Sequence, residues 1–133
     1  MSERPAWITS LSTYVDPISM GTRDLTRSPS TALAAERSDL DGVEVAELHA
    51  PFSHQELILR RELGLGQDVA INPSGGPLSG NPMFTGGLIR FGEAAKKVWS
   101  GENDKVLGHA TSGPALQQNL VCVMGSTTGK AGA

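Results

Sequence analysis

The segment of residues 72–82, NPSGGPLSGNP, constrains the fold more than any other part of this chain. A strand-like stretch at residues 69–71 leads into it, and a helical pattern is predicted to begin at Pro82. Paired glycines allow backbone conformations and close approaches that a side chain would block. Asn81 and Pro82 are typical of a helix N-cap and first helical position, which would gather free backbone amides at one point. We therefore expect a place that can hold a carbonyl oxygen or an anion.

The glycine spacing differs from that of phosphate-binding loops, because neither GxxxxGK[ST] nor GxGxxG is present. A net charge of -3 and scattered basic residues argue against nucleic-acid binding. The three histidines and the single cysteine, Cys122, form no paired spacing of metal ligands, so no metal site is predicted.

The chain length of 133 residues fits one domain, which we expect to span residues 1–125, followed by a flexible tail at residues 126–133. No apolar run approaches the roughly 18 residues that cross a membrane, and the N-terminus lacks a signal-peptide core. One cysteine excludes an internal disulfide and agrees with a reducing compartment. These features predict a cytoplasmic protein without membrane contact.

Strands and helices are predicted to alternate, as in an α/β domain. The predicted strands are residues 7–15, 43–48, 69–71, 105–110 and 120–124, and the predicted helices are residues 32–37, 53–63 and 82–100. The order is therefore β-α-β-α-β-α-β-β.

The helix at residues 53–63 has the clearest boundary signals. Ser53 and Glu56 have the spacing of a capping box, and Phe52 can pack against Leu57 as a hydrophobic staple. Gly64 is placed to end the helix.

The helix at residues 82–100 is predicted to bury a stripe of apolar side chains and to use its glycines for close packing. The stripe contains Leu88, Phe91, Ala95 and Val98, and the glycines are Gly86, Gly87 and Gly92.

Three motifs in order resemble the C-terminal domain of the thiolase superfamily over about residues 7–124. ELHAPFS at residues 47–53 resembles the His-Asp-Cys-Phe segment of thiolases related to sterol carrier protein. Asn72-x-x-Gly75-Gly76 and Gly80-Asn81-Pro82 stand where the family has Asn-x-x-Gly-Gly and Gly-His-Pro. Thr111-Ser112-Gly113 stands where the family has Cys-x-Gly. Together with QQNLVC at residues 117–122, the pattern is similar to a subgroup described as lipid-transfer proteins or acetyl-CoA acetyltransferases.

The resemblance implies a mixed five-stranded sheet with helices on its faces, and it implies which residues form a site. His49 would contact a thioester oxygen, or else be a structural histidine at a strand end. Asn81 would donate a hydrogen bond to a thioester carbonyl from the family's histidine position, or else cap a helix. The other implied substrate-binding residues are Gly75, Gly76, Gly80, Thr111, Ser112 and Gly113. A turn before Gly113 and Pro114 explains Thr111 and Ser112 without any function.

In thiolases an N-terminal domain supplies the cysteine nucleophile, whereas the C-terminal domain supplies a histidine and a second cysteine. Here Asn81 and Thr111 replace the latter two residues, and an amide does not accept a proton near neutral pH. Losing a positioned general base costs about 10²–10⁴-fold in rate. We therefore expect no thiolysis by this chain alone. Cys122 and His109 are expected to be packing residues, His54 to be exposed, and Tyr14 to lie away from the site.

Two functions remain open at this point. In the first, the chain is part of an acyl-CoA thioester site, which a companion thiolase-type chain would complete to give acyltransferase-like or C–C lyase-like activity. In the second, the chain is a non-catalytic scaffold. A coenzyme A thioester is the expected ligand, with no bound cofactor. The partner is expected to be that companion or a second copy of the chain, with the helix that starts at Pro82 as the contact element.

Overall fold

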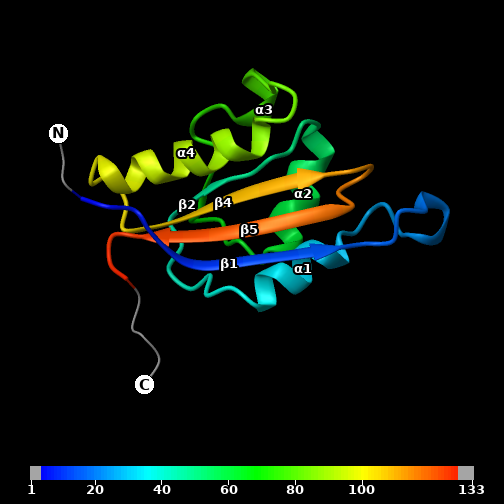
Figure 1. The fold of residues 1–133 in the computed structure, drawn as a ribbon, viewed down its shortest axis with the longest axis horizontal. Helices are drawn as coiled ribbons and strands as arrows, with labels where there is room; N and C mark the ends of the chain where they lie inside the picture. Colours follow the sequence, from blue (N-terminus) through cyan, green and yellow to red (C-terminus); the bar gives the residue numbers. More distant parts are fainter. Residues whose placement is uncertain (1–3, 129–133) are drawn as a thin grey trace.

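The computed structural model describes residues 4–128 and shows an α/β fold built on one mixed five-stranded sheet (Figure 1). The strand order is β1-β5-β4-β2-β3, with β5 antiparallel to β1 and β4, and β2 parallel to β4 and β3. The strands are β1 (Trp7–Val15), β2 (Val45–Glu47), β3 (Ala70–Ile71), β4 (Lys105–Ser112) and β5 (Gln118–Gly125). The helices are α1 (Pro29–Glu36), α2 (Ser53–Glu62), α3 (Gly76–Ser79) and α4 (Gly86–Trp99), with a 3₁₀ turn at Met20–Thr22.

Helices cover the two faces of the sheet unequally. Helices α1 and α2 pack on one face, and α4 alone packs on the other (Figure 1). Because side chains alternate along a strand, neighbouring strand residues enter different cores. In β4, Leu107 packs with α1 and α2, whereas Val106 packs with α4. The predicted mixed sheet with helices on its faces is confirmed at this level. No helix within residues 4–128 is long and apolar enough to cross a membrane.

Helix α2 ends as predicted but does not begin as predicted. Gly64 has φ of 65° and donates its backbone N–H to Arg61, while Leu65 donates to Arg60, which is the Schellman arrangement. The predicted capping box is wrong, because Ser53 is already helical and no side chain caps the helix. Glu56 instead accepts a hydrogen bond from Asn72 Nδ2 at 2.7 Å.

The staple predicted at the same end is not supported either. Phe52 and Leu57 are 60% and 71% exposed, and the Phe52 ring stacks on the ring of His54.

The helix predicted at residues 82–100 is the largest error of the sequence-based assignment. Helix α4 begins four residues later, at Gly86, with Thr85 at the N-cap position. The chain between Pro82 and Thr85 forms a turn in which Phe84 has φ of 70°, and this backbone conformation interrupts a helix. Asn81 is therefore not an N-cap.

The buried stripe of α4 also differs from the predicted one. Leu88 is 71% exposed, and the residues facing the sheet are Arg90, Ala94, Ala95 and Val98, with Phe91 partly buried against them.

The tail predicted at residues 126–133 is described only in part. Ser126 donates its backbone N–H to Asp104 at 2.9 Å, and its hydroxyl donates to the Asp104 carboxylate. Residues 129–133 of the predicted tail lie outside the described residues.

Two of the three glycines in α4 are sites of close approach, and the third is not. A Cβ added to Gly87 would lie 2.5 Å from the Ala110 Cβ and 3.3 Å from the Ala110 Cα on β4. A Cβ on Gly86 would meet His49 Nε2 at 2.6 Å. A Cβ on Gly92 would have no neighbour within 4 Å, so Gly92 has no packing role.

Replacing Gly87 with alanine should therefore destabilise the protein, whereas the same change at Gly92 should stabilise it. We expect Gly87→Ala to lower the free energy of unfolding by about 1–3 kcal/mol, because α4 must move away from β4. Gly92→Ala should raise it by about 0.5–1 kcal/mol through helix propensity alone. Urea denaturation of both variants checks the pair, and equal effects of the two changes would contradict this packing argument.

Candidate functional site

An open cleft of about 620 Å³ lies where β2 and β4 end and α4 begins. Its wall comes from three separate parts of the chain: residues 49–55, which follow β2 and enter α2; residues 81–88, which lead into α4 and form its first turn; and residues 110–116, which end β4 and form the turn after it. The lining residues are His49, Pro51, Phe52, Gln55, Asn81, Pro82, Met83, Phe84, Gly86, Gly87, Leu88 and residues 110–116. Of the predicted site residues, His49, Asn81, Thr111, Ser112 and Gly113 therefore meet at one place.

Both ring nitrogens of His49 are occupied. The backbone N–H of Thr111 donates to His49 Nδ1 at 3.4 Å, so Nδ1 is the unprotonated nitrogen. The proton then lies on Nε2, which is 3.1 Å from Asn81 Oδ1 and donates to it. This pair fits against α4 because Gly86 has no side chain there.

Asn81 is exposed, and its side chain contacts His49 instead of capping a helix. Since Oδ1 accepts from His49, the NH₂ group of Asn81 remains able to donate to a group in the cleft. The sequence was consistent with either a helix cap or a ligand contact, and the contact with His49 excludes the helix cap.

The segment at the end of β4 differs from the predicted turn. Thr111 and Ser112 are the last residues of β4, and the turn begins at Gly113. The Thr111 hydroxyl donates to the Gln118 carbonyl at 3.0 Å, so it is engaged within the hairpin. Gly113 has φ of 73°, and a Cβ there would lie 2.4 Å from Gln117 Oε1, so the turn itself requires glycine.

The paired glycines do not line the cleft, and neither does Gly80. Gly75 and Gly76 have φ of 92° and 59°, and a Cβ on Gly76 would lie 2.9 Å from the Asn72 side chain. Asn72 needs this space because its amide accepts from the Leu48 N–H at 2.6 Å and donates to Glu56. Gly76 therefore allows Asn72 to join the end of β2 to α2, whereas a Cβ on Gly75 would meet the Ser79 side chain.

A buried ion pair fixes the segment that leads to Asn81. Glu47, at the end of β2, accepts from Arg90 Nη1 on α4 at 2.8 Å. The Glu47 carboxylate also accepts from the N–H of Ser74 at 3.0 Å and from its hydroxyl at 2.7 Å. One carboxylate thus holds β2, α4 and the loop after β3 together.

Gln55 lines the cleft although no pattern in the sequence distinguishes it as a site residue. It lies in the first turn of α2 and is only 9% exposed, and its Oε1 is buried without a hydrogen-bond partner among the described residues. A polar residue in a first helical turn is usually solvated, so the pattern carries no signal for this burial.

His109 and Cys122 are core residues, as expected. Burial raises the pKa of the Cys122 thiol to about 11, so it is a poor nucleophile. Burial also lowers the pKa of His109 to about 4, against a smaller raising effect of its hydrogen bond to Asn119. His54 is exposed in α2, and Tyr14 packs in part against the core under α1 and α2.

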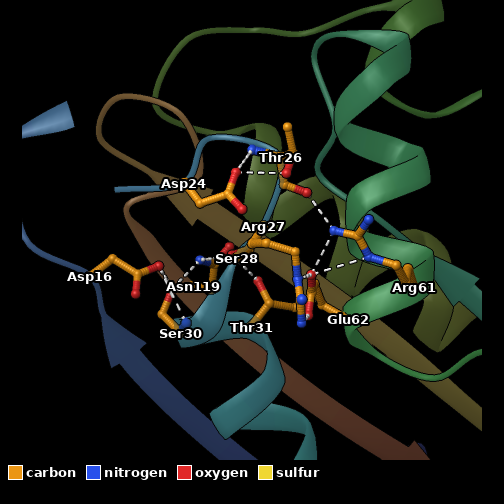
Figure 2. Close-up of polar contacts among 10 residues, drawn as sticks. All are labelled: Asp16, Asp24, Thr26, Arg27, Ser28, Ser30, Thr31, Arg61, Glu62 and Asn119. Atoms are coloured by element: carbon orange, nitrogen blue, oxygen red, sulfur yellow. Dashed lines mark hydrogen bonds and ion pairs between the residues drawn. The ribbon is translucent and has the colours of Figure 1, made fainter. Parts of the chain in front are cut away.

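Asn119 belongs to a buried polar network between β5 and the start of α1 (Figure 2). Its Oδ1 accepts from His109 Nε2 at 3.0 Å, and its NH₂ donates to the hydroxyls of Ser28 and Ser30. Ser30 in turn donates to the Asp16 carboxylate at 2.6 Å. The network anchors the segment between β1 and α1, and His109 Nδ1 has no hydrogen-bond partner within residues 4–128.

The cleft contains one titratable side chain. His49 is the only His, Cys, Asp, Glu, Lys, Arg or Tyr among the residues that line it. Within residues 4–128, no group of three His, Cys, Asp or Glu side chains could hold a metal ion. The cleft can donate hydrogen bonds to a neutral polar ligand, but its own side chains offer no pairing of a nucleophile with a base.

No protein-family model matches this sequence, and no curated protein matches it either. Function is therefore inferred from the cleft and its residues.

Proposed function

We propose that this chain is a thiolase-like C-terminal domain that helps to build a binding site for acyl-CoA thioesters, completed by a companion thiolase-type chain. The observation that carries the proposal is the meeting of His49, Asn81 and Thr111 at one cleft. These residues come from the three motifs that resemble the thiolase domain, and no two of them are neighbours in the sequence.

The arrangement of donors suits a thioester carbonyl. Asn81 is oriented by His49, which is itself oriented by the backbone of Thr111. A donor held by two successive hydrogen bonds loses little freedom when a ligand binds, and this preorganisation favours binding. In this proposal the Asn81 NH₂ donates to the thioester oxygen, and His49 acts by holding Asn81.

A companion would supply the reacting groups that the cleft lacks and would cover the apolar side chains at its rim. Met83, Phe84 and Leu88 are 79%, 99% and 71% exposed beside the polar floor. Phe84 also holds a left-handed backbone that is strained for an aromatic residue, and such strain concentrates at functional sites. These three rim residues all lie within the predicted helix at residues 82–100 that is expected to contact the partner, whereas Gly86 and Gly87 face His49 and β4.

The binding site can be tested with isotope-labelled protein and acetyl-CoA. We expect the amide resonances of Thr111, Ser112 and Gly113 to shift on titration, and Asn81→Ala to weaken binding by about 3–10-fold, the worth of one net hydrogen bond. Asn103→Ala is the matched control, because Asn103 does not line the cleft. Shifts elsewhere only, or equal weakening by both variants, would contradict the proposal.

A companion can be sought by affinity purification from the native source, with mass identification of what is recovered. A thiolase-type N-terminal chain that tightens acetyl-CoA binding would support the two-chain site. If no such chain is recovered and acetyl-CoA does not bind, this proposal is wrong.

A non-catalytic scaffold is the second candidate, and one observation favours it. The residues that line the cleft include no carboxylate, cysteine or lysine beside His49, so the cleft lacks a complete set of reacting groups. A scaffold would bind a partner through Met83, Phe84 and Leu88 and would show no affinity for thioesters with or without that partner.

A further inference from the structure

The side chain of Gln55 is buried at the cleft and lacks the contacts that buried amides normally have. It is 9% exposed, and its Oε1 is buried without a hydrogen-bond partner within residues 4–128. Buried polar side chains are nearly always paired, and an unpaired one lowers stability. An unpaired polar side chain that lowers stability and lines a cleft has a functional explanation if a bound ligand supplies its hydrogen-bond partner.

The cleft lining limits what that ligand can be. It contains no Lys, Arg, Asp or Glu, so nothing there pairs with a phosphate or a charged group. Apolar side chains of Phe52, Met83 and Leu88 line the same cleft as Gln55 and Asn81. Such a surface fits a neutral, slender ligand with a few polar groups.

We propose that Gln55 is a ligand-binding residue that pairs with a secondary amide in the neutral arm of the bound thioester. This inference rests on the proposed thioester site and adds to it the residue that recognises the arm. The terminal torsion of a glutamine side chain is soft, so its amide can turn either end toward the ligand. A secondary amide has both a donor and an acceptor, and it can therefore pair with Gln55 in either orientation.

Two small thioesters separate amide recognition from thioester binding. S-acetyl-N-acetylcysteamine has a secondary amide near the thioester, and S-pentyl thioacetate has methylenes in place of that amide. We expect the full chain, with any recovered companion, to bind the amide probe about 3–10-fold more tightly. In Gln55→Leu this preference should disappear, and the urea midpoint should stay the same or rise. Gln118→Leu, exposed and outside the cleft lining, should keep the preference.

The outcomes are distinguishable. Equal binding of both probes to the native chain, or an unchanged preference in Gln55→Leu, would overturn the role of Gln55 and leave the thioester site standing. A large loss of stability in Gln55→Leu would show a structural residue and would also overturn it. If neither probe nor acetyl-CoA binds, the proposed function and the role of Gln55 both fall.

Discussion

Replacing Arg90 with methionine is expected to lower the free energy of unfolding by about 3–5 kcal/mol, because it leaves a buried carboxylate without its counter-charge. Glu47 has no exposed side-chain surface, and the Arg90 side chain is 6% exposed, so water cannot replace the lost partner. The Ser74 hydroxyl and N–H would still contact the carboxylate, but both are neutral donors.

A second variant separates the charge effect from the loss of arginine packing. In the double variant Glu47→Gln with Arg90→Met, no charge is buried, and much of the lost stability should return. The matched surface control is Lys97→Met, which breaks the exposed pair of Lys97 with Glu102 and should cost less than about 1 kcal/mol. Urea denaturation at pH 7 measures all three variants. An Arg90→Met effect no larger than that of Lys97→Met would mean that Glu47 is solvated after all.

The same substitution should affect the cleft, because Glu47 fixes the loop after β3 and the helix after Asn81. Ser74 and Arg90 flank the segment that contains Asn81 and share the Glu47 carboxylate. A loosened segment would place the Asn81 amide less well, so thioester binding should weaken in Arg90→Met even where the protein remains folded. The ion pair thus links the stability of the fold to the geometry of the proposed site.

The parts of the fold that were predictable are those set by local sequence. The alternation of apolar strands and polar turns located all five strands, and Gly64 marked the end of α2 because a left-handed residue there favours glycine. The meeting of His49, Asn81 and Thr111 was predictable only through the resemblance of their motifs to one family. Nothing in their spacing alone brings residues 49, 81 and 111 together.

Two of the errors share one physical cause, which is that a distant residue takes the hydrogen bond that the local pattern predicts. Glu56 has capping-box spacing but contacts Asn72, and Asn81 has N-cap chemistry but contacts His49. Leu88 follows the helical period but is exposed, because it lies at the start of α4, where it lines the open cleft. A local sequence pattern shows which hydrogen bonds a side chain can form, and the tertiary structure determines which of these hydrogen bonds is present.

Lowering the pH from 7 to 5 is expected to reduce the free energy of unfolding by about 2 kcal/mol through His109 alone. The folded state holds this histidine neutral, with its pKa lowered to about 4 mainly by burial, whereas the unfolded chain protonates it near its ordinary value of 6.5. Between these two values the unfolded state binds more protons than the folded state, so stability falls as pH falls. The loss begins below about pH 6.5 and is complete near pH 4, where it reaches about 3 kcal/mol.

The carboxylates act in a lower pH range, which allows the two contributions to be separated. The hydrogen bonds and charges of Arg27 and Arg61 outweigh burial and hold the pKa of Glu62 below its ordinary 4.5, so its stabilising effect is lost only as pH falls past that value. A change in the free energy of unfolding between pH 7 and pH 5, measured by urea denaturation, therefore separates the contribution of His109 from that of Glu62. His109→Gln, which keeps a donor for Asn119 but cannot titrate, should flatten the profile, and the exposed His54→Gln should leave it unchanged. A profile that stays as steep in His109→Gln as in the native chain would place the titrating group elsewhere. In that case protonation of the buried His109 imidazole would not be the cause of the lower free energy of unfolding at acidic pH.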